Sequence, residues 1–143
     1  MSGTRGPLDL THWVARLRDQ VESLKKVGLA GDLQKAQNIL RAVPAAWVMP
    51  GPESVSANES SPQRRYRVRT EVHVVIAMRH YGDTTGGKAT DALRDLRAEI
   101  GQALIGWQPP DALVTVIPKG GQPLNMASNA MWYRDRFETS VWR

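Results

Sequence analysis

Two stretches of the chain carry apolar residues every three or four positions, the spacing of one face of an α-helix. The first stretch holds Leu10, Trp13, Val14, Leu17, Val21 and Leu24. The second holds Leu93, Leu96, Ile100, Ala103 and Leu104. Asp9 or Thr11 can cap the first helix and Gly28 can stop it, while Gly106 and the Pro109-Pro110 pair end the second. We predict two amphipathic helices with one buried face each.

Two other stretches alternate between apolar and polar residues, as a strand with one buried face does. From Arg65 to His80, one face carries Tyr66, Val68, Val72, Val74, Ile76 and Met78. The opposite face carries Arg65, Arg67, Arg69, Glu71 and His73. Residues 131–142 alternate in the same way, with Tyr133, Phe137 and Val141 on one face. We predict two long strands, the first apolar on one side and basic on the other.

Shorter elements connect these four. Asp32 can cap a short helical run that ends before Pro44, because proline disfavours helix in the residue before it. Residues 45–49 and 113–117 are strand-like. Residues 51–62, rich in Pro and Ser, predict a mobile loop, and residues 118–129 a hairpin loop before the last strand.

This order of elements predicts an α+β fold, formed as a single domain over residues 1–143. We expect a single mixed or antiparallel β-sheet of about four strands, with the two main helices packed on one face. Nothing in the chain is left to cover the other face, where Arg65, Arg67, Arg69, Trp132, Arg134 and Arg136 are expected. We predict that a partner binds this uncovered face and the free edges of the sheet.

The five tryptophans divide between core and surface in this scheme. Trp13, Trp47 and Trp107 are expected in the core. Trp132 and Trp142 are the candidates for a contact surface.

Composition narrows the class of protein. The 143 residues are 41% apolar, which suits one compact core, and the chain contains no cysteine for disulfides or thiolate metal sites. The N-terminus shows no signal peptide, and no stretch reaches the roughly 18 apolar residues of a membrane span. We therefore expect a protein that is neither exported nor bound to a membrane. Its net charge of +5 permits an acidic partner without requiring one.

Catalytic and cofactor motifs are weak. Residues 82–90 nearly spell a phosphate-binding loop, but Ala89 stands where a Ser or Thr would hold magnesium. His12, His73 and His80 lack the i, i+4 spacing at which two imidazoles on a helix share one zinc ion. No nucleophile elbow or pair of acids in an apolar setting is present. We predict no catalytic residue, no metal and no cofactor, and hence no enzyme.

Charged clusters leave two alternatives open. Asp91, Asp95 and Glu99 stack along one helix face, where they either bind a cation or form a charged face that is solvated or contacts another subunit. Arg64, Arg65, Arg67 and Arg69 interleave with Tyr66, a pattern that can contact nucleic-acid phosphates. Only alternate arginines share a face, however, and one tyrosine is a poor stacking platform.

Three segments carry a resemblance to a known family. They are the strand from Val68 to Arg79, the segment Leu104-Ile-Gly-Trp-Gln-Pro109, and the segment Trp132-Tyr-Arg-Asp-Arg-Phe-Glu-Thr139. With the order of elements, they resemble the tail terminator proteins of long-tailed bacteriophages from Leu8 onward. The resemblance implies an α+β subunit that assembles into a hexameric ring on the finished tail tube. Such a ring blocks further polymerisation of the tube and offers a surface to the head connector, without catalytic residues.

The resemblance also implies partners and a location. The partners are further copies of the chain, the tail tube protein and a head-side connector or neck protein, while genome DNA passes through the lumen without specific binding. The location is the tail-neck interface of the virion, assembled in the host cytoplasm. As a separate hypothesis from the charge pattern, we expect the arginines of the long strand (Arg65, Arg67, Arg69) or of the last strand (Arg134, Arg136) to meet Asp91, Asp95 and Glu99 of a neighbour. Trp132 is expected in the same interface. The alternatives are a head-closure or other neck protein, and a small sequence-independent DNA-binding module.

Overall fold

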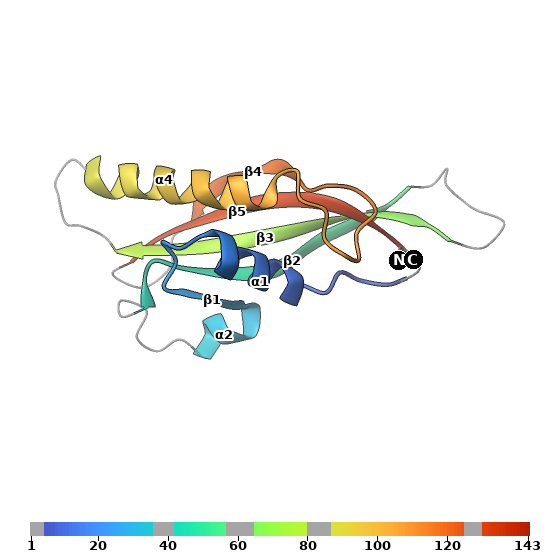
Figure 1. The fold of residues 1–143 in the computed structure, drawn as a ribbon, viewed down its shortest axis with the longest axis horizontal. Coiled ribbons are helices and arrows are strands. Elements are labelled where there is room, and N and C mark those ends of the chain that lie inside the picture. Colours follow the sequence, from blue (N-terminus) through green and yellow to red (C-terminus); the bar gives the residue numbers. More distant parts are fainter. Residues whose placement is uncertain (1–4, 36–41, 57–64, 80–86, 125–129) are drawn as a thin grey trace.

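One five-stranded sheet organises the chain in the computed structural model, which describes residues 5–35, 42–56, 65–79, 87–124 and 130–143. Its strands are β1 (Lys26–Leu29), β2 (Ala45–Val55), β3 (Arg67–Arg79), β4 (Ile117–Leu124) and β5 (Ala130–Trp142). They lie in the order β1-β2-β3-β5-β4, with β1 parallel to β2 and every other pair antiparallel. The helices are α1 (Thr11–Gln20), α2 (Ala30–Lys35) and α4 (Gly87–Leu104) (Figure 1). The predicted α+β class is confirmed, with five strands where about four were expected.

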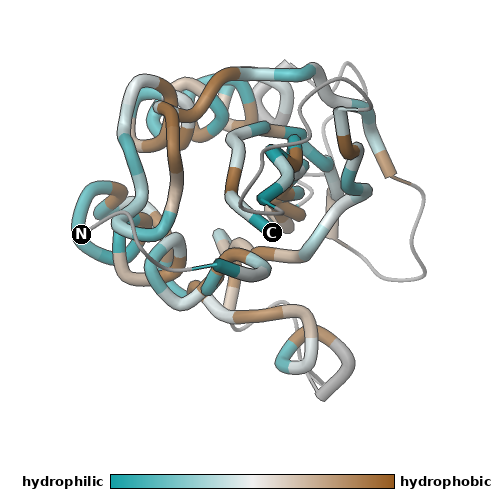
Figure 2. The backbone as a smooth tube through the Cα atoms, turned by 90° about the vertical axis from the view of Figure 1, so that its right-hand side faces the viewer, coloured by the Kyte–Doolittle hydropathy of each residue, from teal (hydrophilic) through white to brown (hydrophobic). Residues whose placement is uncertain are grey.

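The main core lies between the sheet and the pair α1 and α4. Trp13 and Leu17 of α1, Ile100 of α4 and Val74 and Ile76 of β3 are buried there together. Each such side chain contributes about 1.5–3 kcal/mol by leaving water. The apolar face predicted for the long strand is therefore the face that packs on the helices. In Figure 2, brown and teal segments alternate along the tube, as expected for elements with one buried side.

The N-cap position of α1 is Leu10, which makes no side-chain cap hydrogen bond, so neither predicted residue, Asp9 or Thr11, occupies it. The carboxylate of Asp9 accepts hydrogen bonds from the N–H and the hydroxyl of Thr11 at 3.0 and 2.6 Å. Those bonds lower the pKa of Asp9. The ring of Trp13 meets the ring of Trp107 edge to face, with centroids 5.5 Å apart. Both tryptophans belong to the core, as expected, Trp13 fully buried and Trp107 partly.

A second, smaller core covers one end of the opposite face, which the sequence predicted to be uncovered. The rings of Trp47 and Trp132 stack there at 5.7 Å, and Leu33 of α2 packs against this cluster. Trp132 is 5% exposed, so its prediction as a contact residue is wrong. The physical reason is the parallel pairing of β1 with β2, since parallel neighbours need a crossover and α2 lies on that crossover.

The end of the chain holds a strand where a hairpin loop was predicted. Residues 118–124 of the predicted loop form β4 together with Ile117, although this stretch contains two prolines and two glycines. Such residues are tolerated there because β4 lies at the edge of the sheet. The preceding residues 113–116, predicted as a strand, bond elsewhere: the N–H of Leu113 donates to Ser140 and that of Val116 to Trp107.

Three further elements begin or end at other residues than the sequence predicted. β2 continues to Val55, so the mobile loop predicted at 51–62 is wrong for residues 51–55, while 57–62 lie outside the described residues. A register shift between Pro50 and Glu53 lets the strand continue past its prolines. The first helix ends at Gln20, and Gly28, predicted as its stop, lies in β1. The short helix is α2, and residues 36–41 of the predicted run lie outside the described part of the chain.

Candidate interaction surface

Strand register places the predicted basic residues on one side of the sheet. Arg67 of β3 lies opposite Trp142 of β5, Arg69 opposite Ser140, and His73 opposite Arg136. Since side chains alternate along a strand, these residues share the side that faces away from α1 and α4. We call this side the open face. The predicted grouping of Arg67, Arg69, Arg134 and Arg136 on one face is thus present.

The acids predicted as their counterparts lie on the other side of the molecule. Asp91, Asp95 and Glu99 belong to α4, whose buried residues pack on the helix-covered face of the sheet. The carboxylate of Asp91 is paired with Arg94 at 3.1 Å, and both side chains are largely exposed. Arginines of the open face therefore cannot reach these acids within one subunit.

The acids of the open face already have basic partners. Glu71 contacts His73 at 3.1 Å and Arg136 at 3.6 Å, and Glu138 contacts Lys119 at 3.4 Å. These pairs separate two carboxylates that lie directly opposite one another in the register, Glu71 and Glu138. Among the described residues, neither carboxylate is therefore free to neutralise the remaining arginines of this face.

Four arginines of this side have no acidic partner among the described residues. Arg65 lies over the ring of Trp142 at 4.8 Å, and its Nε is buried without a hydrogen bond. The Nε of Arg134 is likewise buried and unpaired within the described part of the chain. Arg67 is half-buried and Arg69 exposed, and neither forms an ion pair with a described residue. The open face thus has a surplus of positive charge at the end formed by Arg65, Arg67 and Arg69.

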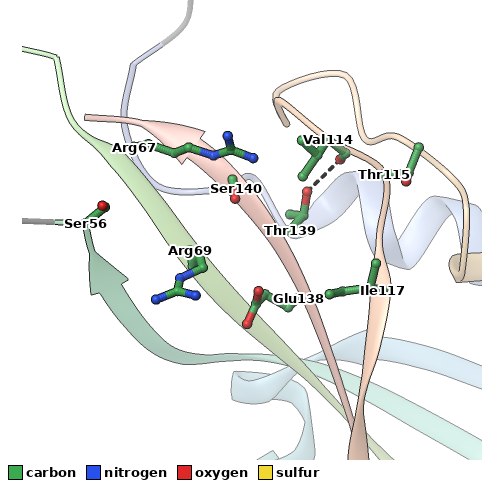
Figure 3. Close-up of a pocket in the computed structure, with 9 residues that line it drawn as sticks. All are labelled: Ser56, Arg67, Arg69, Val114, Thr115, Ile117, Glu138, Thr139 and Ser140. Atoms are coloured by element: carbon green, nitrogen blue, oxygen red, sulfur yellow. Dashed lines mark hydrogen bonds between the residues drawn. The ribbon is translucent and has the colours of Figure 1, made fainter. Parts of the chain in front are cut away.

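That end contains a pocket of about 420 Å³. Figure 3 shows Arg67 and Arg69 extending from β3 beside Ser140 and Glu138 of β5, with Thr115 and Ile117 on the far side. The hydroxyl of Thr139 donates to the carbonyl of Val114 at 2.7 Å and fixes that far wall. We call this the arginine pocket. Exposed apolar side chains occur near it, with Ile117 48% and Val55 57% exposed.

A hollow of opposite charge lies on the helix side. It measures about 650 Å³ and lies between the C-terminal end of α1 and α4. Its lining includes three carboxylates, Asp19, Glu22 and Glu99, and no basic side chain. Glu99 accepts a hydrogen bond from the hydroxyl of Ser23 at 3.1 Å, which orients it toward α1. We call this the acidic groove.

The strands β1 and β4 form the edges of the sheet, and these edges are poorly suited to pairing with another strand. β4 carries Pro118 and Pro123, and the part of β2 beyond β1 carries Pro50 and Pro52. A proline offers no N–H to a new neighbour. At β1, side chains occupy two backbone groups: Arg18 donates to the carbonyl of Val27 at 2.7 Å, and Asp32 accepts from the N–H of Leu29 at 3.2 Å.

One ion pair ties α4 to the sheet. Arg97 donates to both carboxylate oxygens of Asp135, with contacts of 2.9 to 3.2 Å, and lies 4.0 Å from the ring centre of Tyr133. The hydrogen bonds to Asp135 raise the pKa of Arg97. Sequence reasoning missed this pair, since Arg97 and Asp135 are far apart in the chain. The alternating pattern of β5 placed Asp135 on the apolar face, which was the available signal.

The remaining motifs from the sequence do not form a further binding site among the described residues. Residues 82–86 of the phosphate-loop-like segment lie outside the described part of the chain, and α4 begins at Gly87. Across the described ranges, no group of three or more His, Cys, Asp or Glu side chains could hold a metal ion. Among the described helices, none combines the length and the apolar character that crossing a bilayer requires.

Comparison with known proteins assigns the chain to a protein family. The family model described as phage tail terminator protein matches residues 4–143. No curated protein matches the sequence significantly. Among solved structures, a chain from the virion of a native gene transfer agent particle is similar, with 14% identity and a TM-score of 0.45. The match covers 89% of this chain and 98% of that one.

Proposed function

Because this chain belongs to the phage tail terminator family, we propose that it forms a ring that caps the tail tube, ends polymerisation of the tube and provides the surface for attachment of the head. Family membership over residues 4–143 carries this proposal. At the coarser level the protein is a structural component of a phage tail. We propose that its place is the tail-neck interface, with assembly in the host cytoplasm.

The mechanism is binding without chemistry. A cap must bind the last ring of the tube while presenting a far side that no further tube subunit can join. Such a task requires shape and charge complementarity and no catalytic group, so we propose a protein that is not an enzyme and needs no cofactor. Its partners are copies of itself, in a ring that we take to be a hexamer, the tube protein, and a connector or neck protein on the head side.

The ring contact supported best is between opposite sides of neighbouring subunits. The open face carries Arg65, Arg67, Arg69, Arg134 and Arg136, whereas α4 carries Asp91, Asp95 and Glu99 on the other side of the sheet. A contact between two different surfaces of the same chain repeats from copy to copy and closes into a ring when the rotation allows. Trp132 is buried in the subunit and has no part in this contact.

Tail length tests the proposal. We expect cells infected by a phage that lacks this protein to contain tail tubes of uncontrolled, excessive length, because nothing stops the addition of tube subunits. Negative-stain electron microscopy measures the length distribution, and supplying the intact protein in trans is the control that restores it. Tubes of normal length that fail to join heads would contradict capping and favour a head-closure or other neck protein.

A further inference from the structure

The arginines of the pocket and the acids of the groove carry opposite charges, and neither group is neutralised by an ion pair with a described residue. Arg67 and Arg69 line the arginine pocket without an acidic partner, and Glu22 and Glu99 line the acidic groove without a basic one. They lie on opposite sides of one sheet. A surface rich in one charge is best matched by a partner surface rich in the other.

We propose that the arginine pocket of one copy docks against the acidic groove between α1 and α4 of the next copy. This inference rests on the proposed ring. The sequence predicted that acids of α4 alone form the acidic side of the contact. We propose instead that the acidic groove between α1 and α4 forms it. Asp91 is already paired with Arg94, so it is a weaker partner than Glu22 or Glu99.

Two reasons favour a second copy of this chain, rather than another protein or DNA, as the partner of the arginine pocket. First, the same chain carries both complementary surfaces, and they point in different directions, as a head-to-tail contact requires. Second, the prolines of β4 and β2 and the side-chain bonds at β1 disfavour the other common mode of self-association, pairing of edge strands. The exposed side chain of Ile117 on the pocket wall adds apolar area to the charged contact.

Two reciprocal charge reversals test the pairing. In the first variant, Arg67→Glu and Arg69→Glu make the pocket acidic beside an unchanged acidic groove. In the second, Glu22→Lys and Glu99→Lys make the groove basic beside an unchanged basic pocket. Each variant alone then opposes like charges at every contact, and we expect more than about a tenfold loss of ring association for each.

Mixing the two variants restores the match. An acidic pocket then faces a basic groove, and at the next contact a basic pocket faces an acidic groove. We expect native mass spectrometry of the equimolar mixture to show rings in which the two variants alternate, with an even number of copies. Lys25→Glu with Arg79→Glu is the matched control for the arginine variant, because it makes the same change in net charge at exposed positions outside both surfaces and should leave ring formation unchanged.

Several outcomes would overturn the pairing. Rings formed by either variant alone as readily as by the unaltered protein would do so, and so would an equimolar mixture that stays dissociated. Loss of DNA binding in the arginine variant with rings intact would favour a nucleic-acid surface instead. Circular dichroism checks that each variant is folded, and glutamine replacements at the same four positions serve if a reversal unfolds the subunit.

Failure of the wider proposal looks different. If the unaltered protein stays monomeric even with completed tail tubes, ring capping itself is wrong. If the unaltered protein forms rings and the reversals have no effect, capping stands and only the assignment of the two surfaces fails.

Discussion

At the scale of single residues, the bond between Arg97 and Asp135 shows how one charge pair connects two elements. The carboxylate of Asp135 is 10% exposed, while Arg97 is 37% exposed. Two parallel hydrogen bonds between a guanidinium and a carboxylate fix geometry as well as adding energy. The pair therefore sets the position of α4 across β5, and with it the wall of the acidic groove.

Removing Arg97 tests this role. We expect Arg97→Ala to lower the free energy of unfolding by roughly 1–3 kcal/mol, because the carboxylate of Asp135 is left with little water and no partner. Urea denaturation measures the change. Arg94→Ala, which breaks an exposed pair on the same helix, should cost less than about 1 kcal/mol. Equal effects of the two substitutions would show that the buried pair is not special.

At the scale of elements, β4 is a strand whose composition suits only an edge. Its glycines and prolines gave a loop prediction, yet it pairs with β5 from Ile117 to Leu124. Gly120 has φ of +122°, a conformation that side chains rarely adopt, and a β-carbon there would lie 3.3 Å from Nη2 of Arg136. A register shift lies beside it, between Pro118 and Gly120.

Gly120 gives a test of this edge. We expect Gly120→Ala to destabilise the protein by about 1–3 kcal/mol, since alanine is strained at that backbone conformation. Gly31→Ala is the control: it lies in α2 with nothing within 4 Å of an added β-carbon, and it should be neutral or stabilising by up to about 1 kcal/mol. Thermal melting measures both. A harmless Gly120→Ala would mean that β4 can adopt another backbone path.

At the scale of the whole molecule, charge is separated between the two sides of the sheet. Arginines without acidic partners gather on the open face, and carboxylates gather between α1 and α4. In a ring closed by such a contact, much of the positive surface is covered by the neighbour. The assembled ring then offers DNA in its lumen less cationic surface than the free subunit does.

DNA binding tests this expectation. We expect the purified protein to bind duplex DNA only weakly, with a dissociation constant above about 1 µM at physiological salt, and to release it steeply as salt rises. Fluorescence anisotropy over a salt series measures this. A nanomolar complex at physiological salt would instead support the small DNA-binding module.

Periodicity along the chain was enough to predict the long elements. The alternation of β3 and β5 and the helical spacing of α1 and α4 depend on neighbours a few residues away, and so does the grouping of Arg67 and Arg69 on one face. The sequence by itself therefore determined the α+β class, the apolar side of each long element and the basic side of the sheet.

Contacts between distant segments decided the rest. Whether Trp132 lies on a surface depends on α2 and Trp47, and whether residues 117–124 form a strand depends on β5 being available as a neighbour. The acidic groove exists only because α1 and α4 pack side by side, so that Glu22, just after α1, and Glu99 of α4 line one hollow. A local sequence pattern cannot predict these contacts, because their energy comes from burial and pairing between residues far apart in the chain.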